Sequence, residues 1–407
     1  MSIEAIILDG NQRSALAVTR SLGKQGIRVA VGAEQVDSLS SRSKYCHCRS
    51  SFSYLSPFTD PHGFIQTVKD YASTCDRPVL FPMTDITLSE ILHARADFGN
   101  GIIIPFPDYA TYAALSDKIK VLRQADRLRI PIPKTLFPSD YQNQEVLLTE
   151  ATKLGSPLVV KPSLSCIRKE HGWMKTAVQY VTDARELSIL ISRGPFKDYP
   201  FIIQERIEGP GIGIFLLMRE GQVLARFAHQ RIREKPPSGG VSVLCESIEP
   251  PPIAQKAAEG LLQEMKWSGV AMVEFKMDRR DNVPKLMEVN ARFWGSLQLA
   301  ISAGVDFPYL LYCLAKGEKI KPVHNYKIGL KSRWELGDLD HLLIRFKKKS
   351  KDLFLSSNSP SRATVLKNFF VDFFRPTVKN EVLRFNDAGP FLFELKEYLL
   401  SFVKRSL

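Results

Sequence analysis

The chain has 407 residues, of which 44% are hydrophobic and 24% charged, and a formal net charge of +13. At about 150 residues per domain, this length predicts two or three domains with a sizeable core. No apolar run approaches the ~20 residues of a membrane-spanning helix, and the start lacks a basic leader. We therefore expect no integral membrane segment and a cytoplasmic location.

The six cysteines include no CxxC pair and are expected to be reduced thiols. Cys46-His47-Cys48 lacks the second ligand pair of a zinc site. The basic balance is compatible with nucleic acid, an anionic membrane or an anionic substrate such as ATP. No nucleic-acid module motif is visible, and the lysine run 347–349 is interpreted as a solvated face, so no nucleic-acid partner is expected.

The N-terminal part predicts a parallel α/β arrangement. Apolar runs at 3–8 and 27–31 flank helical spacing over 13–25, which is a β-α-β opening. The first turn lacks G-x-G-x-x-G, so a nicotinamide cofactor is not supported. Asp85 follows a further apolar run at 79–82. It is either a ligand group at the end of a strand or a helix N-cap.

The middle of the chain predicts an α+β arrangement. A helix over about 116–128 ends at a proline-rich break, so we place a domain boundary near residue 115. From 158 to 290, short strands alternate with turns and helices, as in a largely antiparallel sheet, and 222–229 is one of these strands. Residues 293–317 predict helix.

The segment 331–407 is more basic, with 15 Lys+Arg against 9 Asp+Glu, and it is the hardest to interpret. Arg333 to Asp338 could return to the functional site. Residues 391–403 predict an amphipathic helix followed by Lys404-Arg405. Packing on the body or on a second subunit is the main interpretation, and a membrane-surface helix is the alternative.

Two strands around Asp281 carry the strongest chemical signal. Residues 270–277 and 284–292 predict a hairpin, and symmetry about Asp281 places Glu274 opposite Glu288. Facing carboxylates repel, so a cation must compensate, and a hard divalent metal is the obvious candidate.

Asn290 and Arg292 lie on the same strand face as Glu288. Two carboxylates and an amide oxygen are ligands suited to Mg²⁺ that carries phosphate, and Arg292 can bind a phosphate or carboxylate in bidentate fashion. The alternative is a solvent-facing strand with ordinary charges. It is disfavoured because apolar neighbours such as Leu286 and Phe293 would make bare carboxylates costly.

Two lysines fit the same chemistry. Lys161 ends an apolar strand, where an ammonium can reach phosphate as a point charge. Lys118 begins a helix, where amide groups also favour anions. Each alone is more often a surface lysine, and their value comes from the motifs around them.

Two further segments carry weaker signals. Residues 201–209 form an apolar strand that ends in polar residues and a Gly-Pro turn, which can present polar groups to an adenine or a ribose. In 231–240, Arg231 and Arg233 share a face if the segment is extended, and Ser238-Gly239-Gly240 can bring N–H groups to an anion. A flexible connector is the alternative for the second segment.

The order of these motifs resembles the ATP-grasp superfamily over about residues 3–320. The most specific part is 287–296, Met-Glu-Val-Asn-Ala-Arg-Phe-Trp-Gly-Ser. Together with Gln230 to Arg233 and Gly239-Gly240, it looks like the predicted carboligases related to carbamoyl-phosphate synthase.

The resemblance implies an ATP-grasp fold with both α/β and α+β parts. It consists of a Rossmann-like domain over 1–115 and an ATP-grasp domain over 116–330, followed by the basic extension 331–407. Within the ATP-grasp domain, a small lid domain spans about 150–205, and the rest is an antiparallel-sheet catalytic lobe.

The resemblance also implies roles for individual residues. ATP phosphates would be contacted by Lys118 and Lys161, and adenine would be held at a hinge by Gln204, Glu205 and Ile207. Mg²⁺, with Mn²⁺ as the alternative, would be bound by Glu274, Glu288 and Asn290. Arg292 would stabilise the transferred phosphoryl group, and substrate choice would lie with Asn11, Asp85, Arg231, Arg233 and Arg292.

Two departures from the family pattern affect the nucleotide contacts. Many members have an acidic ribose ligand just after the hinge, where this chain has Gly211, so Glu208 is the substitute candidate. The lid usually has a glycine-rich phosphate loop, but residues 163–168 contain no glycine. Ser238-Gly239-Gly240 is the alternative cover for the phosphates.

The implied function is an ATP-dependent ligase that activates a carboxylate as an acyl-phosphate for attack by an amine. One alternative is a carboxylase or carbamoyl-phosphate-type enzyme that phosphorylates bicarbonate. Another is a nucleotide-binding regulatory module without catalysis. The expected partners are ATP, a small carboxylate, an amine and a second copy in a homodimer.

Overall fold

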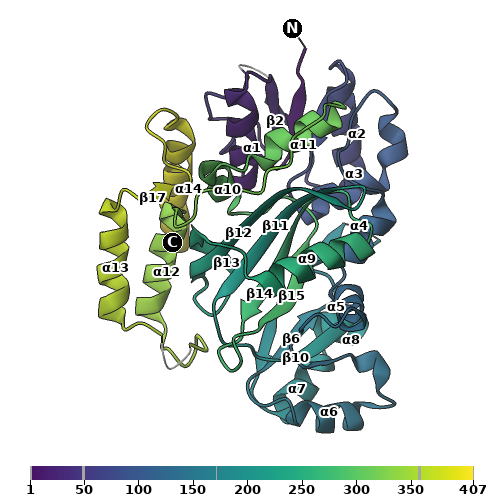
Figure 1. Cartoon of the computed structure of the whole chain (residues 1–407), viewed down its shortest axis with the longest axis vertical. Coiled ribbons are helices and arrows are strands. Elements are labelled where there is room, and N and C mark those ends of the chain that lie inside the picture. The colour runs from purple at the N-terminus through teal and green to yellow at the C-terminus, as the bar shows by residue number, and fades with distance from the viewer. Residues whose placement is uncertain (1, 48–50, 171, 356–358, 407) are drawn as a thin grey trace.

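The computed structural model describes residues 2–47, 51–170, 172–355 and 359–406, so Cys48 lies outside the described residues. Figure 1 shows a parallel sheet in the purple N-terminal part, a large twisted sheet in the centre, a small α+β unit below it, and the yellow C-terminal helices along one side. This mixture of parallel and antiparallel sheets with helices confirms the predicted fold class.

The N-terminal sheet has the order β3-β2-β1-β4, and all its pairings are parallel, as predicted. Every residue of β1, β2 and β4 is buried because helices cover the sheet. Its elements are β1 (Ala5–Ile7), α1 (Arg13–Lys24), β2 (Val29–Ala33), β3 (Phe52–Ser53), α2 (Pro61–Ser73), β4 (Val79–Phe81), α3 (Asp85–His93) and η1 (Arg95–Phe98).

The start of α3 decides between the two interpretations of Asp85. Thr84 is the N-cap, and its side chain and that of Thr87 form a reciprocal capping box. Asp85 is therefore the first residue of the helix and not its cap. Its carboxylate stays available for partners outside α3.

The small unit is built on a second sheet with the order β5-β10-β6-β9. All its pairings are antiparallel, and Leu147, Val160 and Leu187 belong to its own hydrophobic core. Its elements, with the two helices α4 and α5 that precede it, are α4 (Tyr109–Ser116), α5 (Lys118–Arg127), β5 (Thr135–Leu136), η2 (Pro138–Asp140), α6 (Gln144–Thr152), β6 (Leu158–Pro162), β9 (Gln179–Val181), α7 (Ala184–Ile191), α8 (Gly194–Asp198) and β10 (Phe201–Glu205).

A short hairpin, β7 (Cys166–Arg168) with β8 (Trp173–Lys175), leaves the small unit and contacts the N-terminal domain. Trp173 N–H donates to the Phe58 carbonyl at 3.0 Å, and the Trp173 indole donates to the buried carboxylate of Glu90 at 2.9 Å. Arg168 pairs with the same carboxylate at 2.9 Å. The hairpin thus ties the small unit to α3.

The central sheet has the order β15-β14-β11-β12-β13-β16-β17. Its strands are mostly antiparallel, and only the last pair, β16 with β17, is parallel. Its elements are β11 (Gly211–Arg219), β12 (Gln222–Lys235), β13 (Val241–Ser247), α9 (Pro252–Glu264), β14 (Gly269–Met277), β15 (Pro284–Asn290), α10 (Leu297–Ala303), α11 (Phe307–Ala315), β16 (Lys331–Arg333) and β17 (Val378–Asn380).

Two predicted elements in this lobe differ from the structure. The strand predicted at 222–229 continues to Lys235 as β12, so the first half of the suspected connector is a strand. The helix predicted over 293–317 is two helices, because Gly304 ends α10 with a left-handed backbone at φ +111°. Among the described residues no single helix is long and apolar enough to span a membrane. Helices α10 and α11, which meet at a bend of 91°, would together have the length and composition of a span.

The C-terminal extension consists of α12 (Glu335–Lys347), α13 (Arg362–Phe374), β17 and α14 (Gly389–Ser406). It is fastened to the N-terminal domain by buried ion pairs, of which Arg20 with Asp387 at 2.7 Å is the most enclosed. The helix predicted at 391–403 is α14. It packs on the body through Phe391 and Phe393, which lie against a buried cluster that contains Leu16 and Leu39 of the N-terminal domain. Within the extension, Trp334 donates to Glu394 at 2.9 Å and Tyr398 donates to Asp340 at 2.7 Å.

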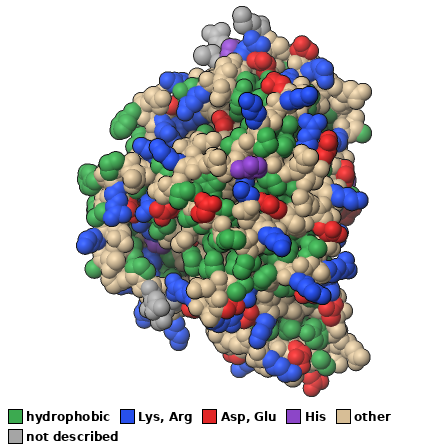
Figure 2. Space-filling model, in the orientation of Figure 1, with side chains coloured by type: hydrophobic (Ala, Val, Ile, Leu, Met, Phe, Trp, Pro, Cys, Tyr) green, Lys and Arg blue, Asp and Glu red, His purple; other side chains and the backbone are tan. Residues whose placement is uncertain are grey.

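Helix α13 carries an exposed apolar face. Leu366, Phe370, Phe373 and Phe374 lie at helical spacing and are 38%, 55%, 61% and 78% exposed. Figure 2 shows hydrophobic side chains beside lysine and arginine at the edge formed by α13.

A buried acidic group in the same extension predicts a pH effect on stability. Burial raises the pKa of Glu381 to about 7, against the opposing charge of Arg13. The folded state therefore holds a proton that the unfolded state releases near its ordinary pKa of about 4.3, so the free energy of unfolding falls as pH rises from about 4.5 to 7. We expect Glu381→Gln to flatten this slope by up to about 1.4 kcal/mol per pH unit.

The measurement is urea unfolding between pH 4.5 and 8. Glu264→Gln, on an exposed part of α9, is the matched control and should keep the wild-type slope. Equal slopes for wild type and Glu381→Gln would contradict a neutral Glu381 at low pH.

Candidate functional site

The facing carboxylates of β14 and β15 are the centre of the site. The two strands pair antiparallel, and Glu274 lies opposite Glu288 as the sequence predicted. The register shifts between Glu274 and Phe275, so perfect symmetry about Asp281 does not extend through the hairpin. The bulge leaves the two carboxylates paired and moves the following residues by one position.

Side chains from three other elements neutralise this pair. Lys118 Nζ, at the start of α5, lies 3.4 Å from Glu288 Oε2, and Arg231 of β12 forms an ion pair with Glu274 at 2.5 Å. Lys161, at the end of β6, is buried beside them. The sequence suggested a metal as the compensating cation, and the protein's own cations already supply part of that charge.

The two carboxylates are electrostatically unequal. For Glu288, burial raises the pKa, but the charges of Lys118, Lys161 and Arg231 outweigh it and hold the pKa below its ordinary value. For Glu274, burial and the charge of Glu288 outweigh Arg231, and the pKa is raised. The surroundings thus stabilise the negative charge of Glu288 more than that of Glu274.

Burial lowers the pKa of the Lys161 ammonium to about 8, with the carboxylates of Glu288 and Glu274 opposing the shift. The carboxylates around Lys161 therefore offset only part of the cost of burying its positive charge. An anionic ligand next to it would stabilise its charge.

Arg292 joins the carboxylate strand to the N-terminal domain. Its Nη2 lies 2.9 Å from Asp85 Oδ2 and donates to Asn290 Oδ1 at 3.2 Å. Asn290 Nδ2 in turn lies 3.5 Å from Glu288 Oε1. The predicted set Glu288, Asn290 and Arg292 is therefore brought together, with Asp85 as its neighbour.

The expected hinge follows β10 and offers one unsatisfied acceptor. Gln204 is fully buried, and its Nε2 donates to Thr135 Oγ1 at 2.8 Å. Its Oε1 has no hydrogen-bond partner among the described residues. The Glu205 carboxylate is occupied, because it accepts from Lys134 N at 2.9 Å and from Arg280 Nη1 at 2.8 Å.

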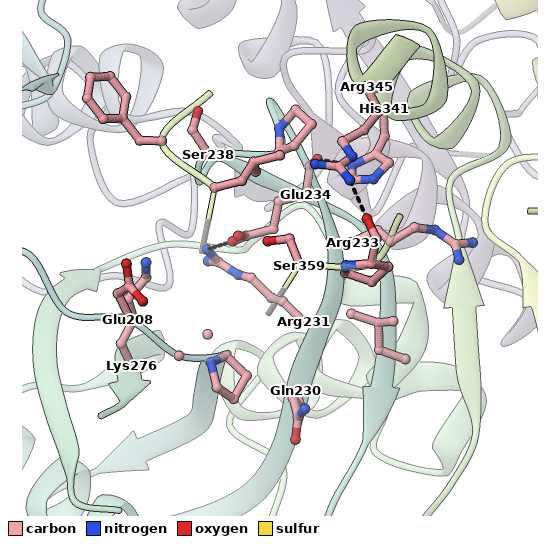
Figure 3. Close-up of a pocket in the computed structure, with 18 of the residues that line it drawn as sticks. Glu208, Gln230, Arg231, Arg233, Glu234, Ser238, Lys276, His341, Arg345 and Ser359 are labelled. Carbon is pink, nitrogen blue, oxygen red and sulfur yellow. Dashed lines mark hydrogen bonds and ion pairs between the residues drawn. The ribbon is translucent and has the colours of Figure 1, made fainter. Parts of the chain in front are cut away.

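Beyond the hinge lies a cavity of about 430 Å³, which we call the hinge cavity. Its walls include Ile207, Glu208, Arg231 and Lys276 on one side and residues of α12 and the following loop on the other. In Figure 3, Arg231 points into this space toward Glu234, with Glu208 and Lys276 facing it and His341 and Arg345 above. The C-terminal extension therefore forms part of the wall.

Lys276 was missed by the sequence analysis. Its Nζ lies 3.5 Å from the Ile207 carbonyl oxygen, at the hinge. The signal was present, because Lys276 is two residues after Glu274 on the same strand and a period of two places both on one face.

Arg233 lies apart from Arg231, contrary to the shared face expected for an extended segment. The pairing of β12 with β13 shifts register on both sides of Arg233. Figure 3 shows its guanidinium directed away from Arg231. It forms buried ion pairs with Asp338 at 2.6 Å and Asp372 at 2.8 Å. Asp338, which could have returned to the site, serves this network.

A second, smaller cavity of about 210 Å³ lies on the other side of the carboxylate strand, and we call it the inner cavity. Its walls include Lys118, Glu288 and Asn290 from the site and Asp85 and Tyr112 from the N-terminal domain. Asn11, the other residue of the N-terminal domain that was expected to select the substrate, does not line this cavity. The Asn11 Oδ1 instead accepts from Leu39 N at 3.1 Å.

The two candidate phosphate covers lie at different cavities. Ser165, in the glycine-free loop, accepts from Lys118 Nζ at 3.0 Å and lines the inner cavity. Ser238 lines the hinge cavity, and its carbonyl accepts from the Tyr180 hydroxyl at 3.4 Å. At the position after the hinge, a Cβ on Gly211 would lie 3.1 Å from Arg231 Cδ, so Arg231 takes up part of the space of a side chain there.

No group of three His, Cys, Asp or Glu side chains that could hold a metal occurs in the part of the chain that the structure describes. Glu274, Glu288 and Asn290 supply two carboxylates and an amide, which is fewer ligands than an all-protein cage. Such a set is typical of Mg²⁺ that is held partly by a substrate's phosphates and water.

Comparison with known proteins agrees with this geometry. Residues 197–335 match the family model described as ATP-grasp in the biosynthetic pathway with Ter operon. A search of curated proteins finds no match.

Among solved structures, the biotin carboxylase domain of Hydrogenobacter thermophilus 2-oxoglutarate carboxylase has a TM-score of 0.61 at 15% identity. The match covers 81% of this chain and 74% of that one. Staphylococcus aureus N5-carboxyaminoimidazole synthetase has a TM-score of 0.59 at 13% identity, over 81% and 82% of the two chains. The chain therefore has the ATP-grasp fold, and the resemblance inferred from its sequence is confirmed.

The ion pairs of Arg233 predict a structural role that stability can measure. We expect Arg233→Met to lower the free energy of unfolding by ~3–5 kcal/mol, because it leaves the carboxylates of Asp338 and Asp372 buried without their cation. The measurement is urea unfolding at pH 7. The control is Arg226→Met, whose half-buried pair with Glu259 at 2.9 Å should contribute about 1 kcal/mol or less. A loss for Arg233→Met no larger than for the control would contradict this role.

Proposed function

We propose that the chain is an ATP-dependent ligase that uses Mg-ATP to convert a carboxylate into an acyl-phosphate, which an amine or similar nucleophile then attacks. The observation that carries the proposal is the opposed pair of Glu274 and Glu288, surrounded by Lys118, Lys161 and Arg231 on an ATP-grasp fold. A site in which carboxylates and cationic side chains lie side by side fits a ligand made of a metal ion and a polyphosphate better than it fits a neutral ligand.

The residues present fit a divalent metal. Glu274, Glu288 and Asn290 would hold Mg²⁺, with Mn²⁺ as the alternative, because two facing carboxylates and a neighbouring amide oxygen are the kind of ligand that these cations prefer. When bound, the metal would neutralise charge on the phosphate oxygens during phosphoryl transfer. Arg231 would then exchange part of its contact with Glu274 for the ligand.

The cations and the hinge would position the nucleotide. Lys118 and Lys161 would bind its phosphates, and Arg292 would stabilise the transferred phosphoryl group. The unpartnered Gln204 Oε1 would accept from the adenine amino group, and Glu205, Ile207 and Glu208 would contact the base and ribose with their backbone and side-chain groups, Ile207 and Glu208 from the wall of the hinge cavity. Lys276 joins this set.

We further propose the division that the sequence suggested: a Rossmann-like part over 1–115, an ATP-grasp part over 116–330 and the extension 331–407. Arg231 and Arg233 both line the hinge cavity, but the guanidinium of Arg233 is held in ion pairs with Asp338 and Asp372. A catalytic role for Arg233 would require it to leave two buried carboxylates, so we assign it a positioning role through β12.

Bicarbonate phosphorylation is the second candidate function. It is favoured by the similarity to the biotin carboxylase domain that was solved in complex with MgADP, ADP and bicarbonate. Because bicarbonate is a small carboxylate-like anion, the same metal and arginine groups could serve it. A substrate panel that contains bicarbonate separates the two functions.

The direct test is ADP release from Mg-ATP by the full chain, with a panel of carboxylates in the presence and absence of amines. We expect release that depends on an acid, and we expect Glu288→Gln to reduce it by at least about 100-fold, because the variant removes a carboxylate that would hold the metal. Glu264→Gln, a distant exposed glutamate, should retain activity.

Two outcomes would contradict the ligase. Acid-dependent release that is unchanged in Glu288→Gln would remove the carboxylate pair from the chemistry. Nucleotide binding without release on any acid, bicarbonate included, would favour a regulatory nucleotide-binding module.

A further inference from the structure

A charged pair that the nucleotide does not require lies at the inner cavity, where Asp85 forms part of the wall and Arg292 is its ion-pair partner. Asp85 lies on the N-terminal domain side, and Arg292 lies between it and the carboxylate strand, 2.9 Å from Asp85 Oδ2 and 3.2 Å from Asn290 Oδ1. Asp85 also accepts from the Tyr112 hydroxyl at 3.4 Å. A phosphate site gains nothing from an additional carboxylate such as Asp85, which would repel the phosphates.

Both members of the pair remain open to a ligand. The side chains of Arg292 and Asp85 are 23% and 28% exposed, and Asp85 lines the inner cavity. The Nε of Arg292 is buried with no hydrogen-bond partner among the described residues. One ligand that carries both a positive and a negative charge can replace such an ion pair beside a cavity. The guanidinium then binds the negative group of the ligand, and the carboxylate binds the positive group.

Most other charges of the cavity wall are already committed. Arg168 pairs with Glu90 at 2.9 Å, and the Asp117 carboxylate caps α5 and accepts from the Ser163 hydroxyl. Lys118 and Glu288 are assigned to the metal and phosphate site, and Lys120 is a further wall cation. Asp85 is thus the wall carboxylate that remains to select a second substrate, with Arg292 as its paired cation.

We infer that the inner cavity binds an α-amino acid as the acid that is activated, with its carboxylate on Arg292 and its ammonium on Asp85. This inference rests on the proposed ligase function. Arg292 donates a hydrogen bond to Asn290 of β15, the strand that carries proposed metal ligands, and Asp85 lies on the other side of Arg292. The carboxylate end of the amino acid therefore faces the phosphates, and its ammonium end faces away from them. Contact with Asp85 keeps the amine protonated and therefore unreactive.

Size and charge narrow the class further. The volume of about 210 Å³ lies below the ~300–1,000 Å³ of pockets for drug-sized ligands, which fits a single amino acid. Tyr109, Tyr112 and Trp173 give the wall flat apolar surfaces for a side chain. A dicarboxylate would place its second negative charge against Asp85 and is rejected.

The reaction balances with the groups named. A carboxylate oxygen of the amino acid forms a bond to the γ-phosphorus, and the bond from that phosphorus to the β,γ-bridging oxygen breaks, so ADP leaves. The nitrogen of a second molecule, an amine, then attacks the acyl carbon. Inorganic phosphate leaves, and the attacking nitrogen releases a proton to solvent.

The test uses hydroxylamine as the amine, so that the natural nucleophile need not be known. The full chain is incubated with Mg-ATP, hydroxylamine and pairs of acids that differ only by the α-amino group: alanine with propionate, and leucine with 4-methylpentanoate. ADP and hydroxamate are both measured. We expect KM for each amino acid to be at least 10-fold lower than for its partner.

The variant Asp85→Asn should raise KM for the amino acids at least 10-fold and leave KM for propionate and 4-methylpentanoate little changed. Tyr112→Phe, which removes one contact to Asp85, should act in the same direction with a smaller effect. Asp97→Asn, an exposed aspartate of the same domain, is the matched control and should change neither. Binding of Mg-ATP, followed by the rise in melting temperature, should be the same in all of these proteins.

Failure of the inference can be told apart from failure of the ligase. If propionate or 4-methylpentanoate matches its amino acid, or if Asp85→Asn raises KM equally for both members of a pair, Asp85 only holds Arg292 and the inference is overturned while the ligase stands. If no acid, bicarbonate included, gives ADP although Mg-ATP binds, the proposed function itself is overturned.

Discussion

The repulsion between Glu274 and Glu288 is the constraint on which the site depends. Backbone pairing of β14 with β15 fixes the two carboxylates opposite each other, and burial prevents water from screening them. Cations from elements far apart in the chain must therefore converge there: Lys118 from α5, Lys161 from β6 and Arg231 from β12. The relative placement of the small unit and the central sheet follows from this requirement.

The same constraint separates the site into two sides. Toward the hinge, Arg231 and Lys276 face the cavity that we assign to the nucleotide, and toward the N-terminal domain, Asp85, paired with Arg292, faces a smaller one. Glu288 has neighbours on both sides. A phosphoryl group held there would be in contact with the cavity that we assign to the acid, which is the proximity that transfer requires.

The sequence predicted those parts of the site that lie on one strand or across one short turn. The hairpin around Asp281 is local, so strand period and turn length were enough to place Glu274 opposite Glu288. Arg233 was misplaced because a register shift in β12 changes which face a residue takes, and the sequence carries no clear signal of it. The ion pairs of Arg292 with Asp85 and of Arg20 with Asp387 join residues that are far apart in the chain and lie in different parts of the fold. The periodicity of the sequence carries no information about such contacts.

The C-terminal extension has a consequence for how the protein can be altered. Its carboxylates Asp338, Asp372 and Asp387 are the ion-pair partners of Arg233 in the central sheet and Arg20 in the N-terminal helix. A chain shortened at residue 330 would leave the buried guanidinium groups of Arg20 and Arg233 without their carboxylate partners. A chimera that exchanges the extension with a relative's must keep acidic partners for both arginines, so the extension and the first helix form one structural unit although they lie at opposite ends of the chain.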